Sequence, residues 1–254
     1  MTFQKLLDFA SKYLQVKESR DEGYAYTQLV IGEMHFLPRV QCELLRTLNF
    51  LRKKFAIQLI GKEGLTIKPV LIPIDLKRAA DDEKYMQELL TQKINAVAIF
   101  HNAYPEVSVE AVDDPYLHEL SGYIDRRCHE LFVQKQTTGW EGMTEDEKIQ
   151  YNYWFSLLKN VLLGDRSDFM VRNFYALQSR LDISLAVLIC GAAHTPYREE
   201  YRPYSVARML RALPVNYIIA MPPSALTCRI KEDPFDFYSP RDETEVNPYS
   251  TSTQ

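Results

Sequence analysis

The chain carries two similar strings, each of which ends an apolar run and places a glycine three residues before a histidine. The first is IGEMH, from Ile31 to His35, and the second is CGAAH, from Cys190 to His194. In an open α/β sheet the chain leaves each strand through a turn at its carboxyl end, and ligand-binding groups collect at that edge. Two such turns on neighbouring strands would bring His35 and His194 together. The chain has only five histidines, so this placement is the main indication of function.

Hydrophobic periodicity predicts alternating strands and helices, which is typical of an α/β fold with a central, mostly parallel or mixed sheet and helices on both faces. Strands are expected at residues 24–31, 56–60, 107–112, 185–190 and 215–220, with a short extended piece at 70–74. Helices are expected at residues 6–14, 40–55, 81–104, 116–136, 145–163, 167–181 and 202–213. The run LAVLIC at 185–190 is the most apolar, so it is expected at the centre of the sheet.

Length and composition indicate one domain. A chain of 254 residues with 46% hydrophobic composition can bury one substantial core. We expect a single domain over residues 1–232 and a poorly ordered tail over residues 233–254, which are rich in Pro, Asp, Tyr, Ser and Thr. The net charge of −4, with acidic and basic residues interspersed, argues against nucleic acid or an anionic membrane as a partner.

Cysteine usage and the amino terminus predict a cytoplasmic protein. The four cysteines are scattered, without the close pairs of a zinc knuckle or a redox dithiol, and are expected to be reduced: Cys42, Cys128, Cys190 and Cys228. The amino terminus is interrupted by Lys5, Asp8 and Lys12, which does not match a signal peptide. No stretch is long and apolar enough to cross a bilayer.

The first string offers two groups for chemistry. Residues two apart on a strand end point to the same side, so Glu33 and His35 should face one way. The pair could ligate one ion, or it could act as a base with an orienting carboxylate. The alternative is that His35 only caps the helix that follows.

The second string and three acidic residues extend this candidate site. His194 follows three small residues, which allow a sharp turn or simple close packing. Glu63 in GKEG, and Asp113 with Asp114 after the strand at 107–112, should lie on the same rim. Such a cluster suits a divalent metal such as Mn, Zn, Co or Fe, although Asp and Glu are also common in turns and helix caps. The candidate metal ligands are His35, His194, Glu33, Glu63 and Asp113.

Arg166 could direct its guanidinium at a substrate carboxylate, a phosphate or a developing oxyanion. A surface salt bridge with Asp165 or Asp168 is the alternative. The other histidines lie in helical segments and are expected to pack or to face solvent: His101, His118 and His129. Cys190 ends a very apolar strand, which argues for burial rather than for a nucleophile. The sequence contains no GxSxG, GxGxxG, HExxH or phosphate-loop motif.

These motifs resemble those of the superfamily that joins erythromycin esterase-like proteins, haem-binding ChaN-like lipoproteins and TIKI/TraB metalloproteases. The resemblance rests on IGEMH, on DRSDFMVRN as an Arg-containing helix, and on CGAAHT, and it covers residues 24–211 in the same order. EAVDDPYL also resembles the acidic strand end of many bacterial members. The resemblance implies a sheet flanked by helices, with one site formed by the two turns. It assigns Glu33 and His35 to the first motif, Arg166 to the arginine, His194 to the second motif and Glu63 to the acidic position.

Known activities in this superfamily include hydrolysis of ester or peptide bonds, sometimes with a metal, and haem binding. Because the chain lacks the signal peptide and lipid-attachment cysteine of the exported branches, a cytoplasmic hydrolase fits better. The leading hypothesis is cleavage of an ester, lactone or peptide bond in a small-molecule or peptide substrate. In it, His35 or Glu33 activates water, His194 shares an ion or transfers a proton, and Arg166 stabilises negative charge.

Two other functions stay open. The same rim could hold haem or a metal without turnover, assisted by tyrosines such as Tyr104, Tyr123 and Tyr197. The chain could also be an effector or toxin-like module that acts only through protein contacts.

Overall fold

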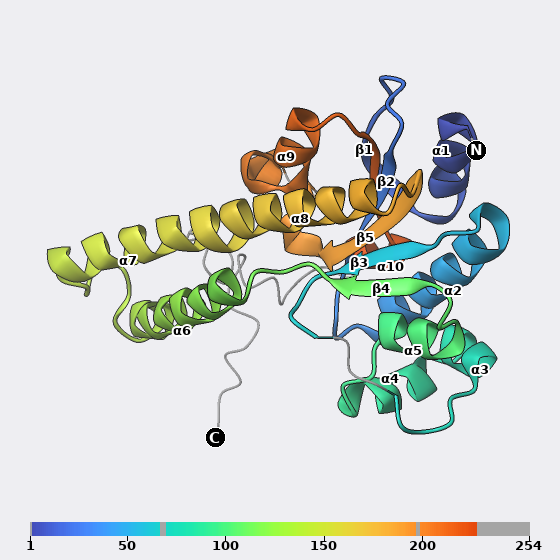
Figure 1. Cartoon of the computed structure of the whole chain (residues 1–254). Coiled ribbons are helices and arrows are strands. Elements are labelled where there is room, and N and C mark those ends of the chain that lie inside the picture. Colours follow the sequence, from blue (N-terminus) through green and yellow to red (C-terminus); the bar gives the residue numbers. More distant parts are fainter. Residues whose placement is uncertain (1, 67–69, 197–198, 228–254) are drawn as a thin grey trace.

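A six-stranded sheet with the strand order β1-β6-β2-β5-β3-β4 forms the centre of the computed structural model, which describes residues 2–66, 70–196 and 199–227 (Figure 1). The strands are β1 (Gln15–Arg20), β2 (Thr27–Glu33), β3 (Leu59–Lys62), β4 (Ser108–Ala111), β5 (Leu185–Gly191) and β6 (Asn216–Met221). The sheet is mixed and mostly parallel, and helices cover both of its faces, so the predicted α/β class is confirmed. The predicted tail at residues 233–254 lies outside the described residues.

The parallel part of the sheet places the two motifs, IGEMH and CGAAH, side by side. Strand β5 lies between β2 and β3, and β4 forms the edge beyond β3. In the β2–β5 register, Gly32 lies opposite Cys190 and Glu33 lies opposite Gly191. Strand β1 is the exception, since it pairs antiparallel with β6. The two turns therefore leave neighbouring strands at the same edge, as the sequence analysis expects.

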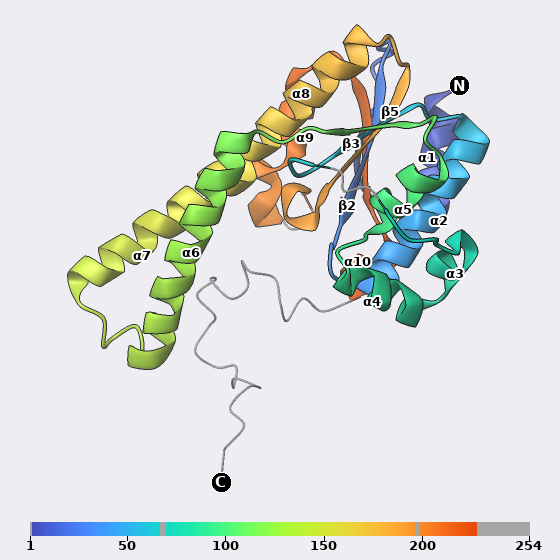
Figure 2. The same ribbon diagram turned by 60° about the horizontal axis from the view of Figure 1, so that its bottom comes forward.

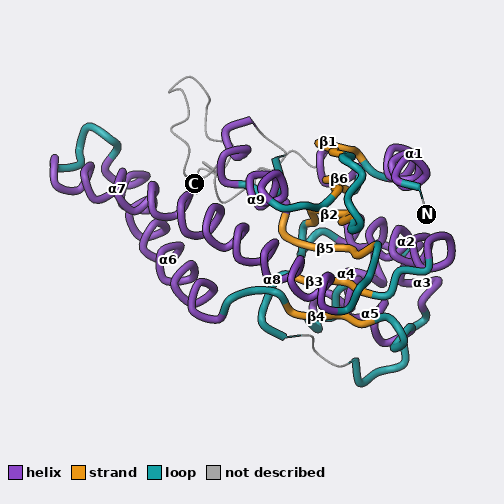
Figure 3. The backbone as a smooth tube through the Cα atoms, turned by 45° about the horizontal axis from the view of Figure 1, so that its top comes forward, coloured by secondary structure: helices purple, strands orange, loops and turns teal. Residues whose placement is uncertain are grey.

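Helices form a layer on each face of the sheet, as Figure 3 shows with the strands in orange between them. One layer consists of α1 (Phe3–Tyr13), α2 (Pro38–Phe55), α3 (Leu76–Asp81), α4 (Glu83–Thr91) and α5 (Ala96–Ala103). The other consists of α8 (Arg166–Arg180) and α9 (Val206–Ala212). The short helix α10 (Pro223–Thr227) follows β6 and contacts α2. No helix of the described segments is both long and apolar enough to cross a membrane.

The alternation of side chains along the strands divides the core into two layers. In β2, Leu29 and Ile31 pack on the α2 side, whereas Val30 packs against α8 and α9. Every residue of β2 and β6 is buried, including polar residues at their ends, because both faces of these strands are covered by helices. Burial of each large aliphatic side chain contributes about 1.5–3 kcal/mol before the entropy cost of folding.

A helical hairpin projects from the edge at which β4 and β5 end (Figures 1 and 2). It consists of α6 (Pro115–Thr138) and α7 (Glu145–Leu157), and α7 continues through a π-helical segment, η1 (Leu158–Asp165), into α8. Apolar side chains of α6 and η1 hold its base together, among them Ile124, Cys128, Leu158 and Leu163. The η1 segment ends directly before Arg166. A π-helical segment changes the direction in which the following side chains point, and such segments often occur at functional sites.

The structure differs from the local predictions in several places. The helix expected at 81–104 is two helices, because Lys93 adopts a positive φ of 62° and the side chain of Asn95 caps the start of α5. The charged run after α1 forms most of strand β1, which the sequence analysis does not assign. Residues 70–74 form no strand.

Candidate functional site

Four neighbouring strand ends carry the acidic and imidazole groups of the candidate site. Glu33 is the last residue of β2, Glu63 follows β3, and Asp113 lies just beyond β4. His194 follows β5 and ends a short 3-10 helix, η2 (Ala192–His194). The carboxyl ends of parallel strands share one edge. The structure therefore places these four side chains along one edge of the sheet.

Glu33 and His35 form a pair between a buried carboxylate and a half-exposed imidazole. The Glu33 side chain is 1% exposed and its Oε1 contacts His35 Nδ1, while the His35 side chain is 48% exposed. The other oxygen of Glu33 accepts a hydrogen bond from Gln41 Nε2 in α2. The negative charge of Glu33 outweighs the opposing effect of burial and raises the pKa of His35 to about 9. At neutral pH His35 is therefore mostly an imidazolium.

Glu63 is the centre of the hydrogen-bond network. Its Oε2 accepts from the Gly191 backbone N–H at 2.5 Å, and its Oε1 accepts from Arg166 Nη2 at 2.8 Å. His194 Nε2 lies 3.4 Å from the same Oε1. Burial opposes ionisation of this carboxyl, but His194, Arg166 and His35 hold the pKa of Glu63 well below its usual range. Glu63 is therefore a fixed carboxylate.

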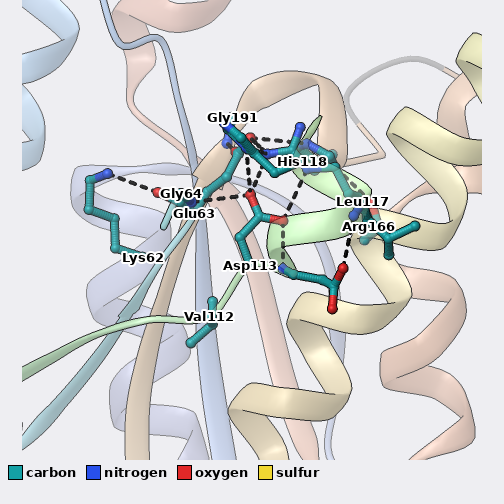
Figure 4. Close-up of polar contacts among 12 residues, drawn as sticks. Lys62, Glu63, Gly64, Val112, Asp113, Leu117, His118, Arg166 and Gly191 are labelled. Carbon is teal, nitrogen blue, oxygen red and sulfur yellow. Dashed lines mark hydrogen bonds and ion pairs between the residues drawn. The ribbon is translucent and has the colours of Figure 1, made fainter. Parts of the chain in front are cut away.

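The buried side chain of Arg166 binds two carboxylates, as Figure 4 shows. Its Nε donates to Asp113 Oδ1 at 3.1 Å and its Nη2 donates to Asp113 Oδ2, in addition to the bond with Glu63. The side chains of Arg166 and Asp113 are 7% and 0% exposed. The proposed surface salt bridge to Asp168 is wrong, since Asp168 pairs with Arg208 at 2.7 Å. The charge of Arg166 is balanced by groups of the site itself.

Two residues that the sequence analysis does not assign to the site also belong to it. Ser167 Oγ lies 2.8 Å from His194 Nδ1, and both residues are buried. His118, in the first turns of α6, places its Nδ1 3.3 Å from Asp113 Oδ2 and 3.4 Å from Arg166 Nη2. Ser167 could have been suspected because it follows Arg166 at the start of α8.

Three of these side chains lie close to Gly191. A Cβ built on Gly191 would lie 3.2 Å from Glu63 Oε2, 3.7 Å from His35 Nε2 and 3.8 Å from His194 Cδ2. A side chain at this position would therefore contact all three. Glu63 Oε2 and His35 Nε2 thus lie beside the same glycine.

The carboxylates do not fit a metal ion as they stand. Within the described residues, no group of three or more His, Cys, Asp or Glu side chains is arranged to hold one. Arg166 lies between Glu63 and Asp113 and supplies the positive charge that a divalent ion would bring. The oxygens of Glu33 contact His35 and Gln41. The metal site, and haem as its alternative, stay predictions.

Two other candidates have structural roles. Asp114 caps α6, because its Oδ1 accepts from the Leu117 backbone N–H at 2.8 Å. Cys190 is fully buried, and burial raises the pKa of its thiol well above the usual value, so it lacks the character of a nucleophile.

Comparisons of the chain with family models, with curated proteins and with solved structures gave no match. The superfamily resemblance stays a prediction from the motifs. What supports a function is the arrangement of side chains around Gly191.

Proposed function

We propose that this chain is a hydrolase of ester, lactone or peptide bonds in which His35 is the general base. The observation that carries the proposal is the direction of the His35 ring. Its Nδ1 is held by the buried carboxylate of Glu33, and its Nε2 lies 3.7 Å from the Cβ position of Gly191. A carboxylate that holds one imidazole nitrogen while the other faces the reacting group is the arrangement that general-base catalysis requires.

The first step is the activation of a water molecule over Gly191. The ionised Glu63 accepts one hydrogen bond from this water through Oε2, and neutral His35 removes its other proton through Nε2. The water oxygen then adds to the carbonyl carbon of the substrate. Glu33 stabilises the imidazolium that forms, because it is a buried negative charge in contact with Nδ1.

Arg166 and His194 keep Glu63 in place for this step. Both contact Glu63 Oε1, while Oε2 lies beside Gly191. Arg166 is already neutralised by two carboxylates, so we assign it a positioning role and not the direct stabilisation of a substrate oxyanion. Ser167 fixes the orientation of the His194 ring through Nδ1.

The proposal has a definite pH dependence. Only neutral His35 can accept a proton, and its pKa is raised to about 9. The rate constant kcat/KM should therefore increase with pH above neutrality and level off above about pH 9. A rate that falls over this interval, with the protein still folded, would assign His35 the role of an acid instead.

The test uses the purified chain with p-nitrophenyl esters, a lactone and a short peptide. The variants are His35→Gln, Glu33→Gln and Glu63→Gln, with His129→Gln as a matched control, because His129 is an exposed histidine on α6. Loss of the base is expected to lower kcat/KM about 10²–10⁴-fold. Equal activity in wild type and in His35→Gln would contradict the proposal. Assays with a chelator test the metal prediction. Activity that is lost with the chelator and restored by Mn, Co or Zn would assign the carboxylates as ligands of a metal ion.

A further inference from the structure

We infer that Lys62 makes this site selective for esters whose acyl part carries a carboxylate, such as the half-ester of a dicarboxylic acid. The inference rests on the proposed hydrolase activity and names the substrate class of that same site. Lys62 is the last residue of β3, directly before Glu63, and its side chain is partly exposed. Figure 4 shows this side chain at the end of β3, on the side away from Arg166.

The charge of Lys62 is not paired with a carboxylate. Within the described residues its Nζ forms no ion pair, and it donates to the Glu63 backbone carbonyl at 2.8 Å. Arg166, in contrast, binds two carboxylates, and His35 contacts Glu33. A carbonyl oxygen has no net charge, and an ammonium group has three N–H donors. The ammonium of Lys62 therefore keeps both its charge and further donors for an anionic partner.

The position of Lys62 suits a substrate whose carbonyl lies beside Gly191. Strand β3 is the direct neighbour of β5, and neighbouring strands lie about 4.8 Å apart. Lys62 pairs with Ile189, two residues before Gly191. Its Nζ lies 3.6 Å from the Cβ position of Gly64, so the ammonium is located at the edge where the strands end. A few methylene groups therefore span from the carbonyl to the ammonium.

The ammonium also lies on the side of the proposed base. Glu33 has the largest effect on the pKa of His35, which it raises, and the charge of Lys62 acts on the same imidazole in the opposite direction. Such an effect requires the ammonium to lie near the His35 ring, because the interaction of two charges weakens with distance. Lys62 and His35 can therefore act on one substrate.

The remaining charges of the site would repel an anionic substrate. Its three carboxylates outnumber its two cationic side chains, His35 and Arg166, and His35 must be neutral to act as the base. A further carboxylate that enters this edge without a cation is repelled. Lys62 supplies the missing cation, so its removal should affect a charged substrate far more than a neutral one.

The experiment compares two esters with the same leaving group and the same chain length. They are p-nitrophenyl hexanoate and the mono-p-nitrophenyl ester of adipic acid, which has a terminal carboxylate in place of a methyl group. The kcat/KM for each ester is measured with the full chain as wild type, Lys62→Met, Lys62→Arg and Lys62→Glu. The control is Lys17→Met, because Lys17 is a partly exposed lysine in the edge strand β1. Circular dichroism spectra and thermal midpoints establish that each variant is folded.

The readout is the ratio of the two kcat/KM values, because a general loss of active protein lowers both values equally. Wild type should prefer the adipate ester. Lys62→Met should lower this preference about tenfold or more, as expected for one charge-assisted hydrogen bond, and mainly by raising the KM for the adipate ester. Lys62→Arg should keep the preference and Lys62→Glu should reverse it. Added salt should weaken the preference of the wild type.

The failure of this inference can be distinguished from that of the proposed function. A wild type that hydrolyses both esters equally, or a Lys62→Met variant that keeps the wild-type ratio, would overturn the role of Lys62 and leave the hydrolase intact. An equal loss of preference in Lys17→Met would do the same, because it would show an effect of overall charge. If folded wild type hydrolyses neither ester, both proposals are wrong.

Discussion

Replacement of Glu33 by Gln tests the electrostatics of the site without an assumed substrate. The change keeps the size of the side chain and an oxygen acceptor beside His35 Nδ1, but removes the negative charge. That charge is the largest cause of the raised pKa of His35, which is about 9 in the wild type. Burial acts in the other direction. The pKa of His35 in Glu33→Gln should therefore fall to the ordinary value of about 6.5 or below.

This fall in pKa should strongly change the protonation of His35 at neutral pH. With a pKa of about 9, roughly 1% of His35 is neutral at pH 7, whereas with a pKa of about 6.5 roughly 75% is neutral. Histidine side-chain NMR titration measures this directly, with His35→Gln identifying the signal. Glu88→Gln, an exposed carboxylate on α4, is the matched control. A wild-type His35 that titrates near 6.5, or a Glu33→Gln variant that still titrates near 9, would refute the electrostatic account.

The Glu33→Gln substitution should also change how the stability of the protein depends on pH. A histidine whose pKa is higher in the folded than in the unfolded chain stabilises the fold fully below the unfolded value of 6.5, and this stabilisation is lost as pH rises through about 9. The difference in free energy of unfolding between wild type and Glu33→Gln should therefore shrink between pH 6.5 and about pH 9. Urea denaturation at a series of pH values measures it. A difference that is constant over this interval would contradict the coupling.

Three further substitutions have definite expected outcomes. Asp113→Asn should lower the free energy of unfolding by about 3–5 kcal/mol, because it leaves a buried Arg166 without its main partner; a loss below about 1 kcal/mol in urea denaturation would contradict the buried pair. Gly61→Ala places a Cβ 2.5 Å from the ring of Phe174 and should cost about 1–3 kcal/mol, so an unchanged thermal midpoint would contradict this packing. Gly191→Ala should lower kcat/KM about tenfold or more in a folded protein, and wild-type activity in this variant would move the reaction elsewhere.

Local patterns predict the interior of the sheet well and its edge poorly. Strand β5 is uniformly apolar because both of its faces are buried, and such a run is visible in the sequence. Strand β1 is a charged edge strand with no fully buried residue, so its apolar signal is weak and pairing with β6 decides its conformation. The break between α4 and α5 depends on one backbone angle, at Lys93, which periodicity does not encode.

The candidate site was predictable where its residues are close in sequence. Glu33 and His35 are two apart on one strand end, and the structure joins them. The partners of Arg166 lie 103 and 53 residues away, at Glu63 and Asp113. The pairing of the guanidinium with these two carboxylates therefore follows from the strand order and not from the local sequence. His118 enters the site because α6 begins directly after β4, which a helical histidine does not reveal by itself.

Strand β5 lies between β2 and β3 in the sheet but is synthesised after both of them. Strand β3 pairs with β5 and β4, and β2 pairs with β5 and β6, so β2 and β3 have no direct contact in the ladder. Glu63 and Gly191 are 128 residues apart, a length that a ribosome adds in roughly 6–26 s at about 5–20 residues per second. During that interval a nascent chain holds Glu33, His35 and Glu63 without the strand that aligns them. The geometry of the candidate site is therefore completed only after β5 has been made, long after β2 and β3.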